Sequence, residues 1–135
     1  MSNFAGSLDA NVLLRLLLND EPAQHQAAKK LFESARGQLA VADTAIIEIA
    51  FVLERPYKFS RVRIEEAING VLLLPKINAN RVLFERALVS FVAHPSLSME
   101  DCCLAAYAYL NDALPLWTFD KKLAHQNTDA KLVIE

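Results

Sequence analysis

The sequence is poor in the residues that interrupt regular structure. Only 3 of its 135 residues are glycine and 5 are proline, which excludes flexible linkers and low-complexity tracts. Cysteine occurs only as the adjacent pair Cys102 and Cys103, and neighbouring cysteines rarely form a normal disulfide. We therefore expect reduced thiols in a reducing compartment, that is, a cytoplasmic protein.

Neither sign of charge is in large excess. Lys and Arg number 14 and Asp and Glu 16, for a net charge of −2, which excludes a globally basic nucleic-acid binder but not a local basic surface. Arg15 and Glu48 interrupt the two longest apolar runs, so no stretch reaches the roughly 20 residues of a membrane span. No signal peptide is recognisable either. With 53% apolar residues, we expect a core and a single domain over residues 1–135.

Short apolar segments alternate with longer segments of helical periodicity. We predict strands at residues 4–9, 39–42, 115–119 and 131–134, and we expect the first two to be buried. We predict helices at residues 11–18, 23–36, 43–55, 62–74, 80–92 and 99–111. This alternation indicates an α/β protein with a parallel sheet, and the long run of helices between residues 43 and 111 predicts a helical insert beside it.

Several helix details can be read from the same pattern. Asp43 or Thr44 is expected to cap the third helix, and Ser60 the fourth. The sequence from Ser98 to Asp101 has the form of a capping box. Apolar residues surround the helix at 43–55, which predicts burial on every side. Trp117, inside a predicted strand, is expected in the core.

Four carboxylates occupy positions that a chain building only a core would avoid. Asp9 ends one predicted strand and Asp120 directly follows another, and ligands of open α/β sheets bind beyond the carboxyl ends of strands. Glu48 interrupts the apolar helix, where an ionised carboxylate is costly unless paired or metal-bound. Asp101 lies in the first turn of a helix. Clustered oxygen ligands with few histidines favour Mg²⁺ or Mn²⁺, and such a cation suits phosphodiester hydrolysis.

Each acid also has a purely structural explanation. Asp9 and Asp120 could be helix N-caps, and Asp101 could be only the acid of the capping box. An exposed position or an arginine partner would explain Glu48. The residues themselves leave both explanations open.

The chain resembles PIN-domain ribonucleases, specifically toxins of the VapC type. The matching segments, in family order and spacing, are LDANVLLRLLL at 8–18, VADTAIIEIAFVLER at 41–55, YKFSR at 57–61, SMEDCCLAAYA at 98–108 and LWTFDKKLA at 116–124. Together they cover nearly the whole chain. The resemblance implies a three-layer α/β/α sandwich with a short-stranded, mostly parallel central sheet. It also implies a Mg²⁺- or Mn²⁺-dependent endoribonuclease, a homodimer, and a cognate antitoxin that blocks the site.

Site residues follow from the resemblance position by position. The matching acids are Asp9, Glu48, Asp101 and Asp120, as catalytic residues and metal ligands. Asn11 matches the asparagine of the family's opening motif and is expected to support Asp9 by hydrogen bonding. Thr118 is the threonine of the T-x-D element that ends at Asp120. The resemblance further implies cleavage to 5′-phosphate and 3′-hydroxyl ends.

One position departs from the family pattern. Ala10 stands where the family usually has threonine, which removes a hydroxyl that could support the site. This motivates an alternative, a catalytically weak or inactive PIN-like module that binds protein. A second alternative is a phosphotransfer protein with Asp9 as phospho-acceptor, but the second aspartate that many such phosphatases carry two residues on is missing here.

Basic residues could guide RNA toward an acidic pocket. Arg55, Lys58, Arg61 and Arg63 form a run without an intervening acid. This run could follow phosphates, could bind an acidic partner, or could be a solvated connector, and the sequence slightly favours the solvated connector. Lys121 and Lys122 adjoin Asp120 and are predicted substrate-binding residues.

Overall fold

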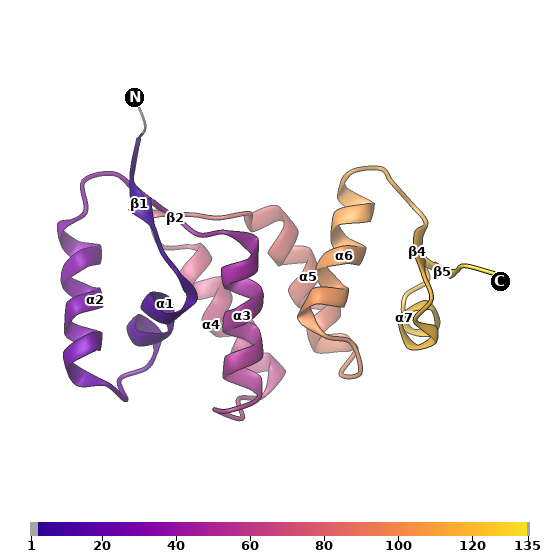
Figure 1. The fold of residues 1–135 in the computed structure, drawn as a ribbon, viewed down its shortest axis with the longest axis horizontal. Helices are drawn as coiled ribbons and strands as arrows, with labels where there is room; N and C mark the ends of the chain where they lie inside the picture. Colours follow the sequence, from indigo (N-terminus) through magenta and orange to yellow (C-terminus); the bar gives the residue numbers. More distant parts are fainter. Residues whose placement is uncertain (1–2, 135) are drawn as a thin grey trace. The chain divides into compact units, whose positions relative to one another are not determined.

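The structure is a computed structural model and describes residues 3–134. Within these residues it contains seven helices and five strands (Figure 1). The helices are α1 (Ala10–Leu17), α2 (Pro22–Ser34), α3 (Asp43–Glu54), α4 (Arg61–Leu72), α5 (Arg81–Ala93), α6 (Met99–Leu110) and α7 (Lys121–Gln126). The strands are β1 (Phe4–Ser7), β2 (Gln38–Ala40), β3 (Ile77–Asn78), β4 (Leu116–Thr118) and β5 (Ala130–Leu132). The predicted α/β class is confirmed, and the elements are consistent with a PIN-like α/β/α fold.

The chain forms two compact units, Met1–Asn80 and Arg81–Glu135. A single domain over residues 1–135 stays a prediction. No helix of the described residues combines the length and apolar character that a bilayer span requires.

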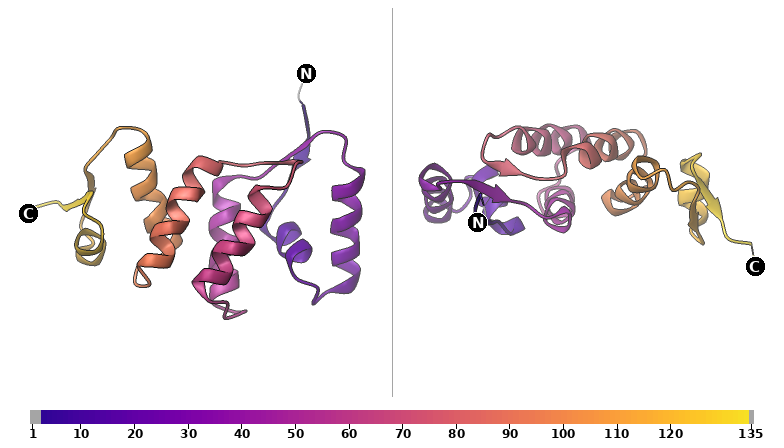
Figure 2. Two further views of the ribbon diagram at one scale, coloured as in Figure 1. Left: turned by 180° about the vertical axis from the view of Figure 1, so that it is seen from behind. Right: turned by 90° about the horizontal axis from the view of Figure 1, so that it is seen from above.

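The first unit is built on a parallel sheet of strand order β1-β2-β3. The α1–α2 pair connects β1 to β2, and the α3–α4 pair connects β2 to β3, because parallel neighbours need a crossover connection. Figure 2 shows α4 on one side of these strands and α1 and α3 on the other. The predicted parallel pairing is therefore confirmed in this unit.

Apolar side chains at helical spacing form the core of the first unit. Helix α3 buries Ile46, Ile49 and Leu53, which are at most 1% exposed, and α4 buries Ile64 and Ile68 to the same extent. Helix α1 packs against both α2 and α3, and α3 packs against α4. Burying such side chains contributes roughly 1.5–3 kcal/mol each, so this layer holds the sheet and helices together.

The second unit pairs α5 with α6 and carries a separate two-stranded parallel sheet, β4-β5. Phe84, Leu88 and Phe91 of α5 are at most 1% exposed. The predicted capping box opens α6, with both of its hydrogen bonds present. Within the described residues neither Cys102 nor Cys103 forms a disulfide, and both are buried.

Three burial predictions are wrong. Strand β1 was expected to be buried, but all four of its residues are exposed because it forms an edge of its sheet. Helix α3 is not buried on every side, since Glu48 is exposed and Phe51 is 60% exposed. Trp117 was expected in the core but is 61% exposed on β4, which belongs to a sheet of only two strands.

Two local predictions also need correction. The N-cap of α3 is Ala42, which makes no side-chain bond, so neither Asp43 nor Thr44 caps this helix. The segment between residues 43 and 111 is not purely helical, because β3 lies within it and pairs with β2. A strand of two residues is too short to leave an alternating pattern. The Ser60 cap is confirmed, its side chain accepting a hydrogen bond from Arg63 N.

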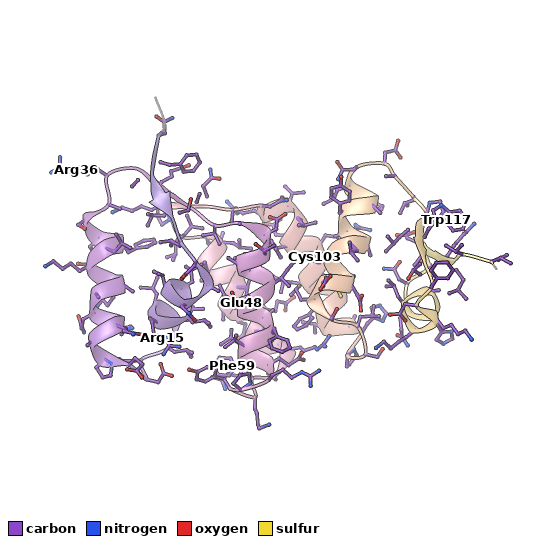
Figure 3. The ribbon with its side chains drawn as sticks, in the orientation of Figure 1. Arg15, Arg36, Glu48, Phe59, Cys103 and Trp117 are labelled. Carbon is purple, nitrogen blue, oxygen red and sulfur yellow. The ribbon has the colours of Figure 1, made fainter. Side chains whose placement is uncertain are left out.

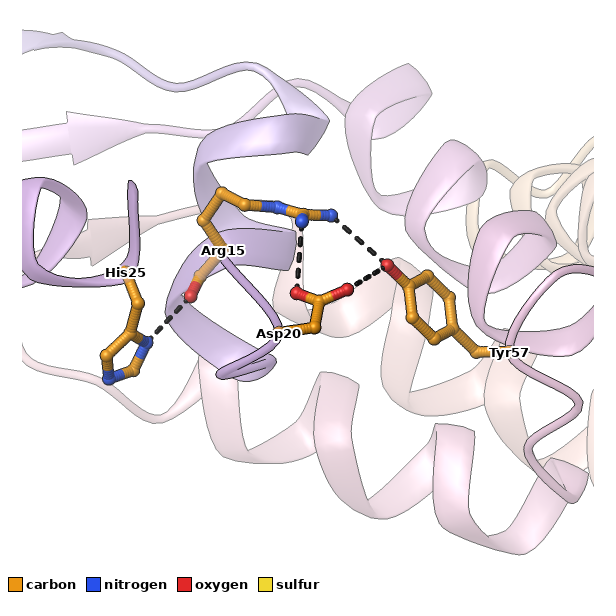
Figure 4. Close-up of polar contacts among 4 residues, drawn as sticks. All are labelled: Arg15, Asp20, His25 and Tyr57. Carbon is orange, nitrogen blue, oxygen red and sulfur yellow. Dashed lines mark hydrogen bonds and ion pairs between the residues drawn. The ribbon is translucent and has the colours of Figure 1, made fainter. Parts of the chain in front are cut away.

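A polar cluster ties the α1–α2 loop to the segment after α3 (Figure 4). Asp20 Oδ1 lies 3.0 Å from Arg15 Nη1, and Tyr57 donates its hydroxyl to Asp20 Oδ2 at 2.5 Å. Arg15 also donates to the Tyr57 oxygen at 3.4 Å, and its carbonyl oxygen lies 2.8 Å from His25 Nδ1. The hydrogen bond from Tyr57, and then the charge of Arg15, hold the pKa of the Asp20 carboxyl below its ordinary value.

This cluster predicts a pH-dependent contribution to stability. Since the folded-state pKa of Asp20 is lowered, the contribution is complete above the unfolded pKa of about 3.9 and is lost as the pH falls through the folded-state value. Tyr57→Phe removes the hydrogen bond and should lower the free energy of unfolding at neutral pH. Urea unfolding of wild type and Tyr57→Phe across acid pH should show that their difference in free energy of unfolding shrinks below about pH 4. A free-energy difference that stays constant down to the lowest pH would contradict this assignment.

Candidate functional site

Asp9 is the N-cap of α1, immediately beyond β1 and Leu8. Its Oδ1 accepts a hydrogen bond from Val12 N at 3.1 Å, so the predicted capping role is confirmed. Within the described residues its other oxygen, Oδ2, accepts no hydrogen bond from the protein. Asp9 is exposed, so the capping role leaves an oxygen available to a ligand.

A pocket of about 350 Å³ opens beside Asp9 between α1 and α2. It is lined by Asp9, Asn11, Val12, Arg15, Gln24, Ala27, Ala28 and Leu31. Asn11 therefore shares a pocket with Asp9, but the hydrogen bond expected between them is replaced by the one from Val12 N. The sequence did not predict that Gln24 lines this pocket, because Gln24 lies on α2 and Asp9 caps α1. The helical spacing between Val12 and Arg15 is the signal that could have placed Arg15 on the same face as Val12.

Glu48 lies on the exposed side of α3 (Figure 3). The apolar neighbours of Glu48 in the sequence predict a buried carboxylate that needs a partner. That prediction is wrong and the alternative of an exposed position is confirmed, because an exposed carboxylate is hydrated and remains ionised at little cost. Burial therefore gives no support to a metal-binding role for Glu48, and the role stays a prediction from the resemblance.

Asp101 is half-buried at the third position of α6. Its Oδ2 accepts a hydrogen bond from Ser98 N at 3.2 Å, and its own N–H donates to Ser98 Oγ at 3.0 Å. The structural explanation of Asp101 as the acid of a capping box is thus confirmed. Within the described residues Oδ1 accepts no hydrogen bond from the protein, so a ligand role is compatible with the box.

Asp120 is the N-cap of α7, two residues beyond β4. Its Oδ1 accepts hydrogen bonds from Lys122 N at 2.9 Å and Leu123 N at 3.1 Å. Thr118 Oγ1 accepts from Asp120 N at 2.9 Å, so Thr118 fixes the backbone on which Asp120 is carried. Lys121 is exposed in the first turn of α7, as is Lys122.

The four predicted metal ligands are divided between the two units. Asp9 and Glu48 belong to the first unit, and Asp101 and Asp120 to the second. Among the described residues of each unit, no group of three His, Cys, Asp or Glu side chains lies close enough together to hold a metal ion. The donor chemistry nevertheless fits a hard divalent cation, since each capping aspartate retains one carboxylate oxygen outside its cap. The ligand set therefore stays a prediction.

Comparison with known protein families supplies a match over nearly the whole chain. Residues 7–128 match the model of the PIN domain, a range that includes Asp9, Glu48, Asp101 and Asp120. Comparison with curated proteins gives no match. PIN domains are generally nucleases, and those nucleases usually use divalent metals. The chain, with its parallel strands and its helix-capping aspartates, therefore belongs to the PIN domain family.

Proposed function

We propose that this protein is a Mg²⁺- or Mn²⁺-dependent endoribonuclease, the VapC-type toxin component of a toxin–antitoxin pair. The observation that carries the proposal is the family match, which spans all four acids of the predicted ligand set. A cognate antitoxin and a homodimer belong to the same proposal, because the sequence resemblance implies them. The alternative is a PIN-like module that binds protein without cutting RNA.

Asp9, Glu48, Asp101 and Asp120 would hold the cation. When bound, it would supply an acidified water and offset negative charge on the scissile phosphate. The chain's own contribution is to hold its ligands in position before substrate arrives. Two backbone amides fix the Asp120 carboxylate, and Thr118 fixes the backbone beneath it. The proposed products are 5′-phosphate and 3′-hydroxyl ends.

The departure at Ala10 leaves all four acids in place. Ala10 is only 2% exposed, so its methyl group belongs to the packed core of the first unit. A hydroxyl at a buried position would need a hydrogen-bond partner. The absence of threonine at this position therefore does not by itself argue for an inactive protein.

The role of Asp9 can be separated from its capping role. Asparagine caps helices as well as aspartate does, whereas alanine costs about 1 kcal/mol. We expect Asp9→Asn to keep the free energy of unfolding and to abolish metal-dependent cleavage of total RNA. Asp9→Ala should abolish cleavage and also lower the free energy of unfolding by about 1 kcal/mol. End sequencing of the RNA should find discrete new 5′ ends with wild type only. Cleavage by Asp9→Asn at the wild-type rate would contradict the assignment. Metal binding by wild type without any cleavage would indicate a narrower substrate or a silenced site, whereas neither metal binding nor cleavage would favour the binding module.

Glu48→Gln tests the one predicted ligand that has no structural role. Because Glu48 is exposed and glutamine has a similar helix propensity, the free energy of unfolding should change by less than about 0.5 kcal/mol. Mn²⁺ binding, followed by electron paramagnetic resonance, should weaken. Glu66→Gln, at an exposed glutamate of α4, is the matched control. Equal Mn²⁺ titrations for the two variants would remove Glu48 from the ligand set.

Lys121→Glu tests the proposed phosphate contact beside Asp120. An acid at the first position of α7 favours the helix dipole, so the fold should not be weakened. We expect kcat/KM for RNA cleavage to fall and its logarithmic salt dependence to flatten by roughly 0.7 for one lost contact to a single strand. Lys131→Glu, an exposed position on β5, makes the same change of charge. A salt slope equal to that of this control would exclude the contact.

A further inference from the structure

The segment joining α3 to α4 is unusually basic for a chain with a net charge of −2. Four cations occur between residues 55 and 63 without an intervening acid. Aromatic side chains accompany them, Phe51 before the run and Phe59 within it. We define the connector surface by Phe51, Arg55, Lys58, Phe59 and Arg63.

Only one of the four cations is neutralised by an acid. Arg61 Nε lies 2.7 Å from Glu54 Oε2, and its side chain is 15% exposed. The remaining cations, Arg55, Lys58 and Arg63, are exposed. Within residues 3–134 none of these three forms an ion pair with a carboxylate. The surface therefore presents three uncompensated positive charges.

The aromatic side chains of this surface lie beneath its guanidinium groups. The Cζ of Arg63 lies 4.0 Å from the ring centroid of Phe59, and that of Arg55 lies 5.9 Å from the ring of Phe51. Phe51 is 60% exposed, and Phe59, labelled in Figure 3, is half-buried. Guanidinium planes and aromatic rings are the two kinds of side chain on which unpaired bases stack.

The stability of the first unit does not account for all of these residues. Arg61 and Arg63 lie in the first turn of α4, where a cation opposes the helix dipole. Lys58 adopts a left-handed backbone with φ of 56°, which is unfavourable for any residue with a Cβ. Phe51 of α3 is exposed and therefore contributes little to the hydrophobic core. Glu54 compensates Arg61, so the folded chain alone leaves unexplained the charge of Arg63, the backbone of Lys58 and the exposed ring of Phe51, and a ligand is the better explanation.

We propose that the connector surface binds single-stranded RNA. Arg55, Lys58 and Arg63 contact successive phosphates, and unpaired bases stack on Phe51 and on the Arg63 guanidinium above Phe59. Single strands fit this surface better than duplexes, because stacking requires bases free of a partner strand. This inference rests on the proposed function only in taking RNA as the substrate.

Binding can be measured without cleavage. The full chain carrying Asp9→Asn is titrated against a fluorescein-labelled oligouridine about twenty nucleotides long, long enough to span several stacked bases. Fluorescence anisotropy at several salt concentrations gives Kd and its salt dependence. A duplex RNA of equal length serves as the comparison, and the proposal predicts tighter binding of the single strand.

Arg63→Glu is the charge variant. It places an acid three residues after Ser60, the N-cap of α4, which completes a capping box, so weaker binding will not come from a weaker helix. We expect a higher Kd and a salt slope reduced by roughly 0.7 for one lost phosphate contact. Lys30→Glu, an exposed lysine on α2, makes the same change of net charge and should have a smaller effect.

Phe51→Ala is the stacking variant. Loss of one base-stacking platform should weaken binding roughly 5- to 150-fold, with the salt slope unchanged. Leu73→Ala, at a residue 66% exposed near the end of α4, is the matched control and should bind as the parent does. Because Phe51 is exposed, its removal should leave folding intact.

Any of the following binding results would overturn the inference. The first is no binding of the oligouridine, and the second is an equal effect of Arg63→Glu and Lys30→Glu. The third is an unchanged Kd for Phe51→Ala together with equal competition by polyglutamate, which would indicate a surface for an acidic protein. The proposed function fails separately, when wild type does not cleave RNA although the surface variants weaken binding as expected. Cleavage by wild type with unaffected binding by both variants would leave the function intact and reject the surface.

Discussion

The first amide groups of every α-helix lack carbonyl partners within the helix, and this constraint organises the acids of this protein. Asp9 satisfies it for α1, Asp120 for α7, and Asp101 completes the box that opens α6. Each carboxylate is thereby fixed by backbone donors and still keeps one oxygen outside its cap. The same three residues can therefore serve both the fold and a metal-dependent reaction.

Charge is distributed differently on the connector between α3 and α4. There Arg63 in the first turn of α4 opposes the helix dipole, and Lys58 takes a backbone conformation that costs free energy. The three aspartates of the predicted ligand set thus agree with local helix requirements, whereas Lys58 and Arg63 of the basic connector conflict with them. Such local conflicts tend to occur at functional sites, and this contrast separates the connector surface from ordinary solvated charge.

Burial was harder to predict than secondary structure. The apolar periodicity of α3 was clear, but which side lacked a neighbour was not, so Glu48 was placed inside and is exposed. The same limit applies to Phe51, Trp117 and strand β1. Periodicity reports that a face can be buried, while exposure depends on which other elements cover it. The two-residue strand β3 left no pattern of its own.

The sequence by itself determined the α/β class, the parallel strands and the caps at Ser60 and Ser98, because each depends on residues a few positions apart. It also placed Asp9 and Asp120 after strands, where capping and ligand binding coincide. Only the tertiary structure decided that Arg15, Asp20 and Tyr57 form one cluster, that Gln24 lines the pocket beside Asp9, and that Glu48 is exposed. These contacts join residues from different elements, and their geometry is set by helix packing that no local pattern records.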